Sequence, residues 1–175
     1  MIRFAKSLAV TVLFAIAAAP AATADSGFDY LEGLTGTWRG TGAVRIKDDA
    51  DPEKIVCKVD GKLNGAGQGL ELNGRCGGER FTGTFKISLT YNRVAKSYSA
   101  IWRDSLGSKS PPLTGLRNGN KLVFRVKHND FETKGRAIST LVVDTQSSRF
   151  RITGRTTPDA ANSDFVSADL VFVKS

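Results

Sequence analysis

The chain contains one histidine and two cysteines, and these few residues limit the chemistry that it could perform. A Ser-His-Asp or Cys-His catalytic site would need His128, and a metal site with several histidines cannot form within one chain. The His128 imidazole could instead ligate haem or hydrogen-bond a ligand. It could equally be a strand-end residue beside the Asn129-Asp130 turn, because no partner motif accompanies it. We therefore expect no enzyme activity and no bound cofactor.

Two short motifs suggest ligand sites, but each lacks part of the required pattern. The glycine-rich stretch 65–69 could hold a phosphate only if a helix followed it, and the next predicted element is a strand. Four carboxylates precede that stretch: Asp48, Asp49, Asp51 and Glu53. A calcium loop of the EF-hand type would need glycine where Lys54 stands. The sequence therefore predicts a solvated acidic loop rather than a metal site.

Residues 1–24 have the three parts of a secretory signal peptide. Arg3 and Lys6 precede an apolar run over 8–19, and Ala22-Thr-Ala24 fits a cleavage site. The run is shorter than the ~20 residues of a membrane-spanning helix, so we do not expect the chain to span a membrane. The pattern predicts a periplasmic or secreted protein, cleaved after Ala24, with one mature domain over 25–175.

Basic residues outnumber acidic ones by 25 to 17, which gives a net charge of +8. Such an excess can attract an anionic partner at a cell envelope, or can simply keep the surface soluble. No run of mixed basic and aromatic residues is present, so we do not expect nucleic-acid binding. Arg149, Arg151 and Arg155 share one face of a predicted strand, where they would contact an anionic envelope component or remain solvated.

Apolar and polar residues alternate with a period of two through most of the chain after the leader, which is typical of half-buried strands. Ten segments are predicted strands: 38–46, 56–63, 70–76, 81–91, 98–104, 113–117, 121–128, 136–144, 149–155 and 165–174. Only 28–34 has a short helical pattern. The sequence predicts an all-β fold, a barrel or a sandwich. We favour a single antiparallel up-and-down barrel of about 8–10 strands with a short N-terminal helical turn, because closure removes exposed edges.

The two cysteines lie on neighbouring predicted strands, and folding the chain between those strands sorts their residues by polarity. Cys57 then faces Cys76 and Leu63 faces Leu70, while the charged side chains fall on the opposite face. Directly opposed residues of an antiparallel pair are close enough for a bridge. In an exported protein this register predicts a Cys57–Cys76 disulfide rather than a free catalytic cysteine.

Large aromatic residues share the inward parity of several predicted strands: Phe81, Phe85, Tyr98, Trp102, Phe124 and Phe150. Among the inward glycines of the same strands, they could line an apolar pocket in which Tyr98 supplies a polar group. A filled barrel without a cavity is the alternative. The candidate ligand-binding residues are Phe85, Tyr98, Trp102, Phe124 and His128.

The segment Phe28-Asp-Tyr-Leu-Glu-Gly-Leu-Thr-Gly-Thr-Trp38 resembles the start of lipocalins and other calycins, in which a helical turn precedes a Gly-x-Trp motif. The run Gly36-Thr-Trp-Arg-Gly-Thr-Gly42 is also similar to nitrobindin-like haem barrels. The lipocalin resemblance implies that Trp38 packs across the closed end of a barrel and that Gly36 admits it.

Two hypotheses about function follow from these patterns. A hollow barrel would be a periplasmic or secreted carrier of a small apolar ligand. A filled barrel would favour a cell-envelope interaction or inhibitor protein that acts through its basic outer surface. The sequence does not predict the oligomeric state.

Overall fold

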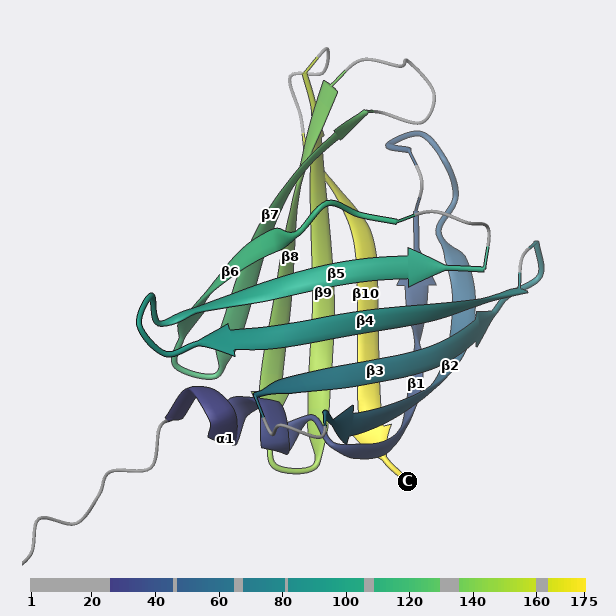
Figure 1. Ribbon diagram of the computed structural model, residues 1–175. Helices are drawn as coiled ribbons and strands as arrows, with labels where there is room; N and C mark the ends of the chain where they lie inside the picture. Colours follow the sequence, from purple (N-terminus) through teal and green to yellow (C-terminus); the bar gives the residue numbers. More distant parts are fainter. Residues whose placement is uncertain are drawn as a thin grey trace, which may run out of the picture.

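The computed structural model describes residues 26–45, 47–64, 68–80, 82–105, 109–129, 136–159 and 164–175. In these ranges the chain forms one helix and ten strands (Figure 1): α1 (Ser26–Gly33), β1 (Gly36–Val44), β2 (Glu53–Leu63), β3 (Gly69–Gly77), β4 (Thr82–Asn92), β5 (Ser97–Asp104), β6 (Leu113–Asn118), β7 (Lys121–Asn129), β8 (Arg136–Gln146), β9 (Arg149–Pro158) and β10 (Phe165–Lys174). Each strand pairs antiparallel with the next one along the chain, and β1 pairs with β10 to close the barrel. The predicted fold class is confirmed.

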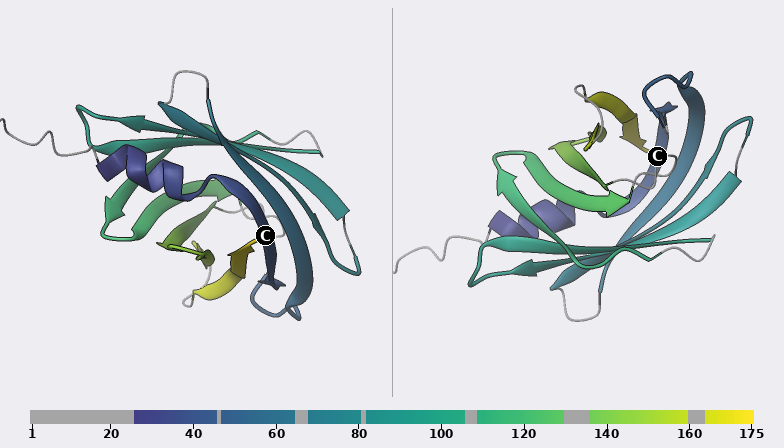
Figure 2. Two further views of the ribbon diagram at one scale, coloured as in Figure 1. Left: turned by 90° about the horizontal axis from the view of Figure 1, so that it is seen from below. Right: turned by 90° about the horizontal axis from the view of Figure 1, so that it is seen from above.

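The helix lies at one end of the barrel. Strands β3, β4 and β5 cross β8, β9 and β10 at a steep angle, and α1 lies below them (Figure 1). Seen from below, α1 lies across the barrel (Figure 2). We call this the helix end, where β1, β3, β5, β7 and β9 begin, and the opposite end the far end. The predicted signal peptide, 1–24, lies outside the described residues.

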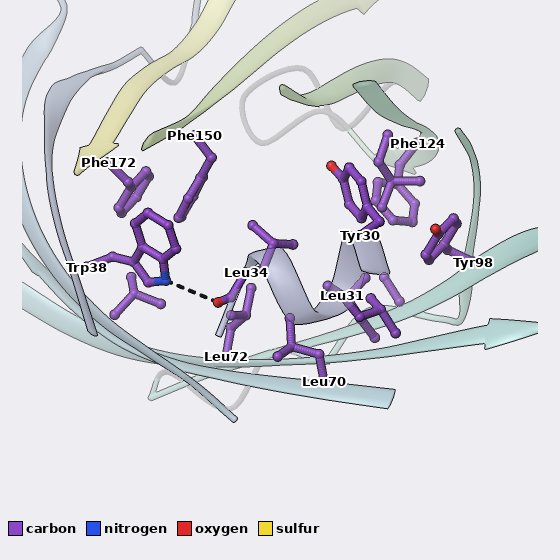
Figure 3. Packing of buried hydrophobic residues seen from close by; sticks show 14 of the residues in the cluster. Tyr30, Leu31, Leu34, Trp38, Leu70, Leu72, Tyr98, Phe124, Phe150 and Phe172 are labelled. Carbon is purple, nitrogen blue, oxygen red and sulfur yellow. Dashed lines mark hydrogen bonds between the residues drawn. The ribbon is translucent and has the colours of Figure 1, made fainter. Parts of the chain in front are cut away.

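The hydrophobic core is densest at the helix end (Figure 3). Tyr30, Leu31 and Leu34 lie on one face of α1 and the turn after it, and all three are buried against strand residues such as Leu70 and Leu122. One apolar face on a short helix is what a surface element needs in order to pack on a barrel. The helix therefore contributes side chains to the interior instead of merely covering its rim.

The inward glycines have a packing role. Three of them each face a phenylalanine on the neighbouring strand: Gly40 faces Phe172, Gly74 faces Phe85 and Gly115 faces Phe124. A Cβ atom at any of these glycines would overlap the opposing ring. The rings therefore lie flat over the glycine backbone, which explains why the largest and smallest residues alternate on the inner face.

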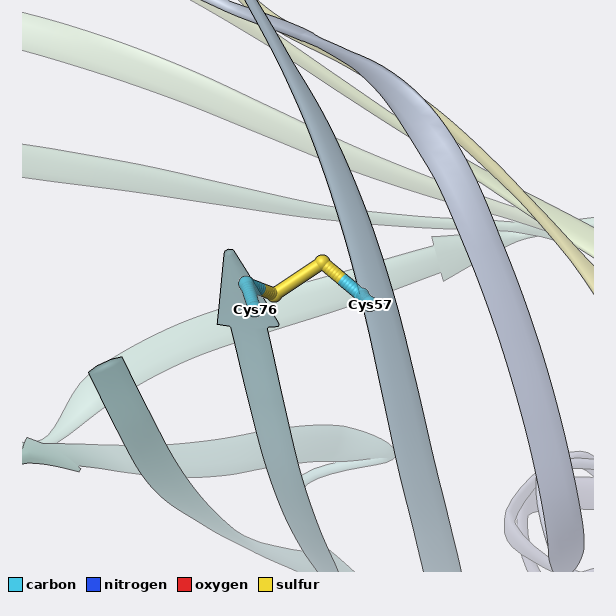
Figure 4. Close-up of a disulfide and its surroundings, with 2 residues drawn as sticks. All are labelled: Cys57 and Cys76. Carbon is cyan, nitrogen blue, oxygen red and sulfur yellow. A yellow bond between two sulfur atoms is a disulfide. The ribbon is translucent and has the colours of Figure 1, made fainter. Parts of the chain in front are cut away.

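The register predicted for the β2–β3 hairpin is confirmed. Cys57 pairs with Cys76 and Leu63 with Leu70. The two cysteines form a disulfide on the inner face, with Cα atoms 4.1 Å apart (Figure 4). The chain has no free cysteine within the described residues.

Removing the disulfide by replacing both Cys57 and Cys76 with alanine should lower the free energy of unfolding by about 3 kcal/mol. The bridge closes a segment of 19 residues and restricts the unfolded chain accordingly. Urea denaturation of the oxidised protein and of the double variant measures the difference. Equal midpoints would contradict the prediction, and the reduced wild-type protein serves as the control.

Candidate functional site

Trp38 closes the helix end of the barrel. Its side chain is fully buried, and its indole Nε1 donates a hydrogen bond to the carbonyl oxygen of Leu34 at 3.0 Å. The ring of Phe150 packs edge-on against it, with centroids 4.9 Å apart, and the Lys174 ammonium lies 5.4 Å from the ring centroid. These contacts join the end of α1 to the inner wall of the barrel.

Gly36 lets the chain turn from the helix into β1. Its φ of +101° lies in a region that residues with a side chain rarely adopt. A Cβ atom there would also approach Lys174 Cε to 3.1 Å. Glycine at this position therefore allows the chain to enter the strand with Trp38 directed inward.

Two tyrosines tie α1 to the barrel. Tyr30 donates a hydrogen bond from its hydroxyl to the carbonyl oxygen of Val143 at 2.9 Å, and Tyr98 does the same to Gly27 at 2.9 Å. Their rings are 5.7 Å apart. Tyr98 is thus packed under the helix and only 1% exposed, so the structure does not place it beside Trp102 as a polar group of an open pocket.

Replacing Tyr30 with phenylalanine should cost about 1 kcal/mol at neutral pH, the usual value of one hydrogen bond. Burial raises the pKa of the Tyr30 phenol well above its ordinary value. Above about pH 10 the unfolded chain releases this proton while the folded chain keeps it, so the wild-type protein should lose stability as the pH rises. Urea denaturation near neutral pH and near pH 11 tests this. If the difference in free energy of unfolding between the wild-type protein and Y30F were the same at both pH values, the predicted effect of the Tyr30 proton would be wrong.

Phe85 and Trp102 form an aromatic stack at the far end. Their ring centroids are 4.8 Å apart and their planes differ by 13°. Both side chains have inward parity, yet 37% of Trp102 is exposed and Phe85 is only half-buried. Further inward apolar residues in the same half-buried state are Val44, Ile87, Leu113, Leu141, Ile152 and Leu170. These inward apolar residues toward the far end are therefore less completely buried than those that pack against α1.

Phe124 lies deeper than this stack. It is 3% exposed and its ring covers Gly115, so it belongs to the packed core. The structure thus brings Phe85 and Trp102 together near the far end. Phe124 and Tyr98 lie below them in the barrel.

His128 begins a chain of hydrogen bonds across three strands at the far end. Its Nε2 lies 2.8 Å from Ser139 Oγ, which lies 2.8 Å from Thr156 Oγ1. Its Nδ1 is 3.0 Å from the carbonyl oxygen of Asn129. When Nδ1 carries the proton and donates to that carbonyl, Nε2 accepts from the Ser139 hydroxyl. The three side chains form a polar site on an otherwise apolar inner wall.

Sequence reasoning found His128 but missed Ser139 and Thr156. Both are inward by strand parity, and Ser139 pairs directly with Thr156. The missed signal was a polar residue at an inward position on each of two neighbouring strands. Thr156 is 6% exposed and is the buried polar residue of the described core.

The three arginines of β9 share an outward face, and each is engaged by a neighbouring side chain. Arg151 donates two hydrogen bonds to Asp169, at 2.7 and 2.6 Å, and this contact lowers the pKa of the Asp169 carboxyl. Arg155 pairs with Asp164 at 3.0 Å, and Arg149 donates to Gln146 at 2.8 Å. The charges of Arg151 and Arg155 are therefore compensated by carboxylates, whereas Arg149 contacts a neutral side chain.

The acidic loop residues also form local contacts. Asp49 pairs with Lys47 at 3.4 Å, and Glu53 accepts a hydrogen bond from Arg80 at 2.8 Å. In the part of the chain that the structure describes, no three His, Cys, Asp or Glu side chains are grouped so that they could hold a metal ion.

Comparison with known proteins does not assign the chain to a family, because neither the protein-family models nor the curated proteins include a match to it. The closed antiparallel barrel is compatible with a lipocalin-like or calycin-like fold. Among the described residues, no helix has the length and apolar character needed to cross a membrane.

Proposed function

We propose that this chain is an exported β-barrel protein that binds a small apolar ligand in the far half of its interior. The observation that carries the proposal is the Phe85–Trp102 stack, an inward aromatic surface that is left partly exposed. Removing the apolar surface of an aromatic ring from water lowers the free energy. A ligand that covers the exposed inward ring of Trp102 would therefore bind more tightly.

The direction from which the ligand enters follows from the closed helix end. Trp38, Leu31 and Leu34 fill that end, so a ligand enters from the far end and stops above Phe124 and Tyr98. In this arrangement Phe85 and Trp102 are wall residues, and Phe124 and Tyr98 support the floor. The site serves binding and not catalysis.

The polar site gives the ligand an orientation. His128, Ser139 and Thr156 offer hydrogen-bonding atoms at the far end, suited to a polar group at one end of an apolar molecule. A long-chain fatty acid is a suitable probe of this chemistry.

The proposal also includes export of the protein and a lipocalin-like origin of the barrel. The leader pattern of residues 1–24 favours export, and a disulfide is typical of oxidising compartments. The helical turn followed by Gly36 and Trp38 supports a lipocalin-like origin, in which the tryptophan closes the barrel.

Titration of the mature protein with a fluorescent fatty acid tests the function. We expect saturable binding that an unlabelled long-chain fatty acid reverses, and H128Q should weaken binding of the acid more than binding of its methyl ester. If the wild-type protein bound neither the fatty acid nor its methyl ester saturably, the carrier function would be refuted.

A further inference from the structure

The outer surface of the barrel differs in charge pairing between its two walls. On β7–β10 and the turns beside them, carboxylates neutralise several cations through ion pairs: Lys121–Asp144 at 3.8 Å, Arg136–Asp159 at 3.2 Å, Arg151–Asp169 at 2.6 Å and Arg155–Asp164 at 3.0 Å. These exposed pairs contribute little to stability, but they compensate part of the charge of this wall.

In the described part of the wall formed by β1–β5, fewer cations are paired with a carboxylate. Its outward positions carry these cations: Arg39, Lys54, Lys58, Lys62, Arg75, Lys86 and Arg103. The outward carboxylates are Asp60, which accepts a hydrogen bond from Thr37 at 2.6 Å, and Glu71, which pairs with Lys86 at 2.8 Å. Within the described ranges, Arg39, Lys58, Arg75 and Arg103 therefore have no carboxylate within ion-pair distance.

Strand pairing aligns three of these cations in one row. Arg39 is directly opposite Lys58 across β1 and β2, and Lys58 is directly opposite Arg75 across β2 and β3. Like charges at directly opposed positions repel each other, because their Cβ atoms lie only about 5 Å apart. On the next pair of strands, Lys86 likewise faces Arg103, and the Lys86 ammonium also pairs with Glu71. An anion that bridges such a row relieves the repulsion.

The same wall is hollowed on its outside. Two adjoining hollows, of about 440 and 680 Å³, share Lys58 and Arg75. Hydroxyl and amide groups line them beside the cations, including Asn73, Thr84 and Thr41, and the smaller hollow is also lined by Asp60 and Asp104. The volumes fall in the range of ligand-binding clefts, and the lining combines charge with neutral hydrogen-bonding groups.

We propose that this outer surface, the basic groove formed by Arg39, Lys58, Arg75, Lys86 and Arg103, binds an acidic polysaccharide. Its cations recur at the strand spacing of about 4.8 Å, which suits a polymer with closely repeated carboxylate or sulfate groups. Its threonine and asparagine side chains can hydrogen-bond to sugar hydroxyls.

Other anionic partners fit this surface less well. No aromatic residue occupies an outward position of β1–β5 within the described residues, so the bases of a nucleic acid would have no ring to stack on. Among the described outward positions of β1–β5 most side chains are charged or carry a hydroxyl or amide group, and Val56 is the large apolar one that is mostly exposed, which is a small surface for insertion into a lipid bilayer. The basic groove lies outside the barrel, so the proposal does not depend on the internal ligand.

Calorimetric titration with a heparin decasaccharide at low ionic strength tests the basic groove. The triple variant R39Q/K58Q/R75Q should bind about tenfold more weakly and with a smaller salt dependence, because it loses three exposed charge contacts. The matched control R125Q/K127Q/R149Q loses the same charge from the opposite wall and should change affinity less than about threefold.

Several outcomes would overturn the proposal: no heparin binding by the wild-type protein, an equal loss in both triple variants, or tighter binding of single-stranded DNA or of phosphatidylglycerol vesicles. The groove variant should melt at or above the wild-type temperature, since it removes like-charge repulsion. A lower melting temperature would contradict the repulsion on which the proposal rests. Fatty-acid binding should be unchanged in both variants, which separates this test from that of the internal site.

Discussion

Truncation of Trp38 to alanine should lower the free energy of unfolding by about 3–5 kcal/mol. The side chain is fully buried, packs against Phe150 at 4.9 Å and holds the Leu34 carbonyl through its indole nitrogen. The alanine variant leaves a cavity, and the Leu34 carbonyl oxygen loses its hydrogen-bond donor. For a domain whose total stability is commonly about 5–15 kcal/mol, this is a large fraction.

Chemical denaturation of W38A and W38F separates the cost of the cavity from the cost of the lost hydrogen bond. W38F keeps most of the ring volume and loses only the hydrogen bond and part of the packing, so its loss should be clearly smaller. A W38A loss below about 1 kcal/mol would show that Trp38 does not close the barrel as the structure indicates.

Truncation of Trp102 to alanine should have the opposite balance, with a large effect on binding and a small one on stability. The affinity for the fluorescent fatty acid should fall about tenfold or more, because the variant removes the largest apolar contact proposed for the ligand. The stability cost should be near 1 kcal/mol, since the ring is 37% exposed and its main described contact is the stack on Phe85.

Leu116 provides a matched control for this test. It is another large apolar residue, 63% exposed, but it lies on the outward face of β6. L116A should leave fatty-acid affinity unchanged. If W102A and L116A reduce the affinity equally, or if neither does, the ligand does not contact the far-end stack.

The barrel and the register of its β2–β3 hairpin could be predicted because strand alternation and turn residues are local signals. The face of each residue follows from its parity, and the pairing of Cys57 with Cys76 follows once polar and apolar residues must separate. The helical turn before Gly36 was likewise readable from a short pattern.

The depth of a residue along the barrel could not be predicted in this way. Tyr98 and Trp102 lie on the same strand with the same parity, yet one is buried under α1 and the other is exposed at the far end. Parity gives the side of the wall and not the distance from the helix. The position of α1 decides which inward residues are covered.

Other groupings across strands could not be predicted. The predicted β2–β3 register places Lys58 opposite Arg75, but Arg39 joins them only because β1 pairs with β2 in the observed register. The contact of Arg151 with Asp169 depends in the same way on the pairing of β9 with β10. Each residue alone is an ordinary exposed charge.

The central claim is that ligand binds inside the barrel at the far end, and the indole NMR signals of the two tryptophans test it most directly. Trp38 lies at the helix end and Trp102 at the far end. On addition of the unlabelled fatty acid, the Nε1–H signal of Trp102 should shift strongly while that of Trp38 stays in place. Binding that leaves the Trp102 signal unmoved would contradict the account.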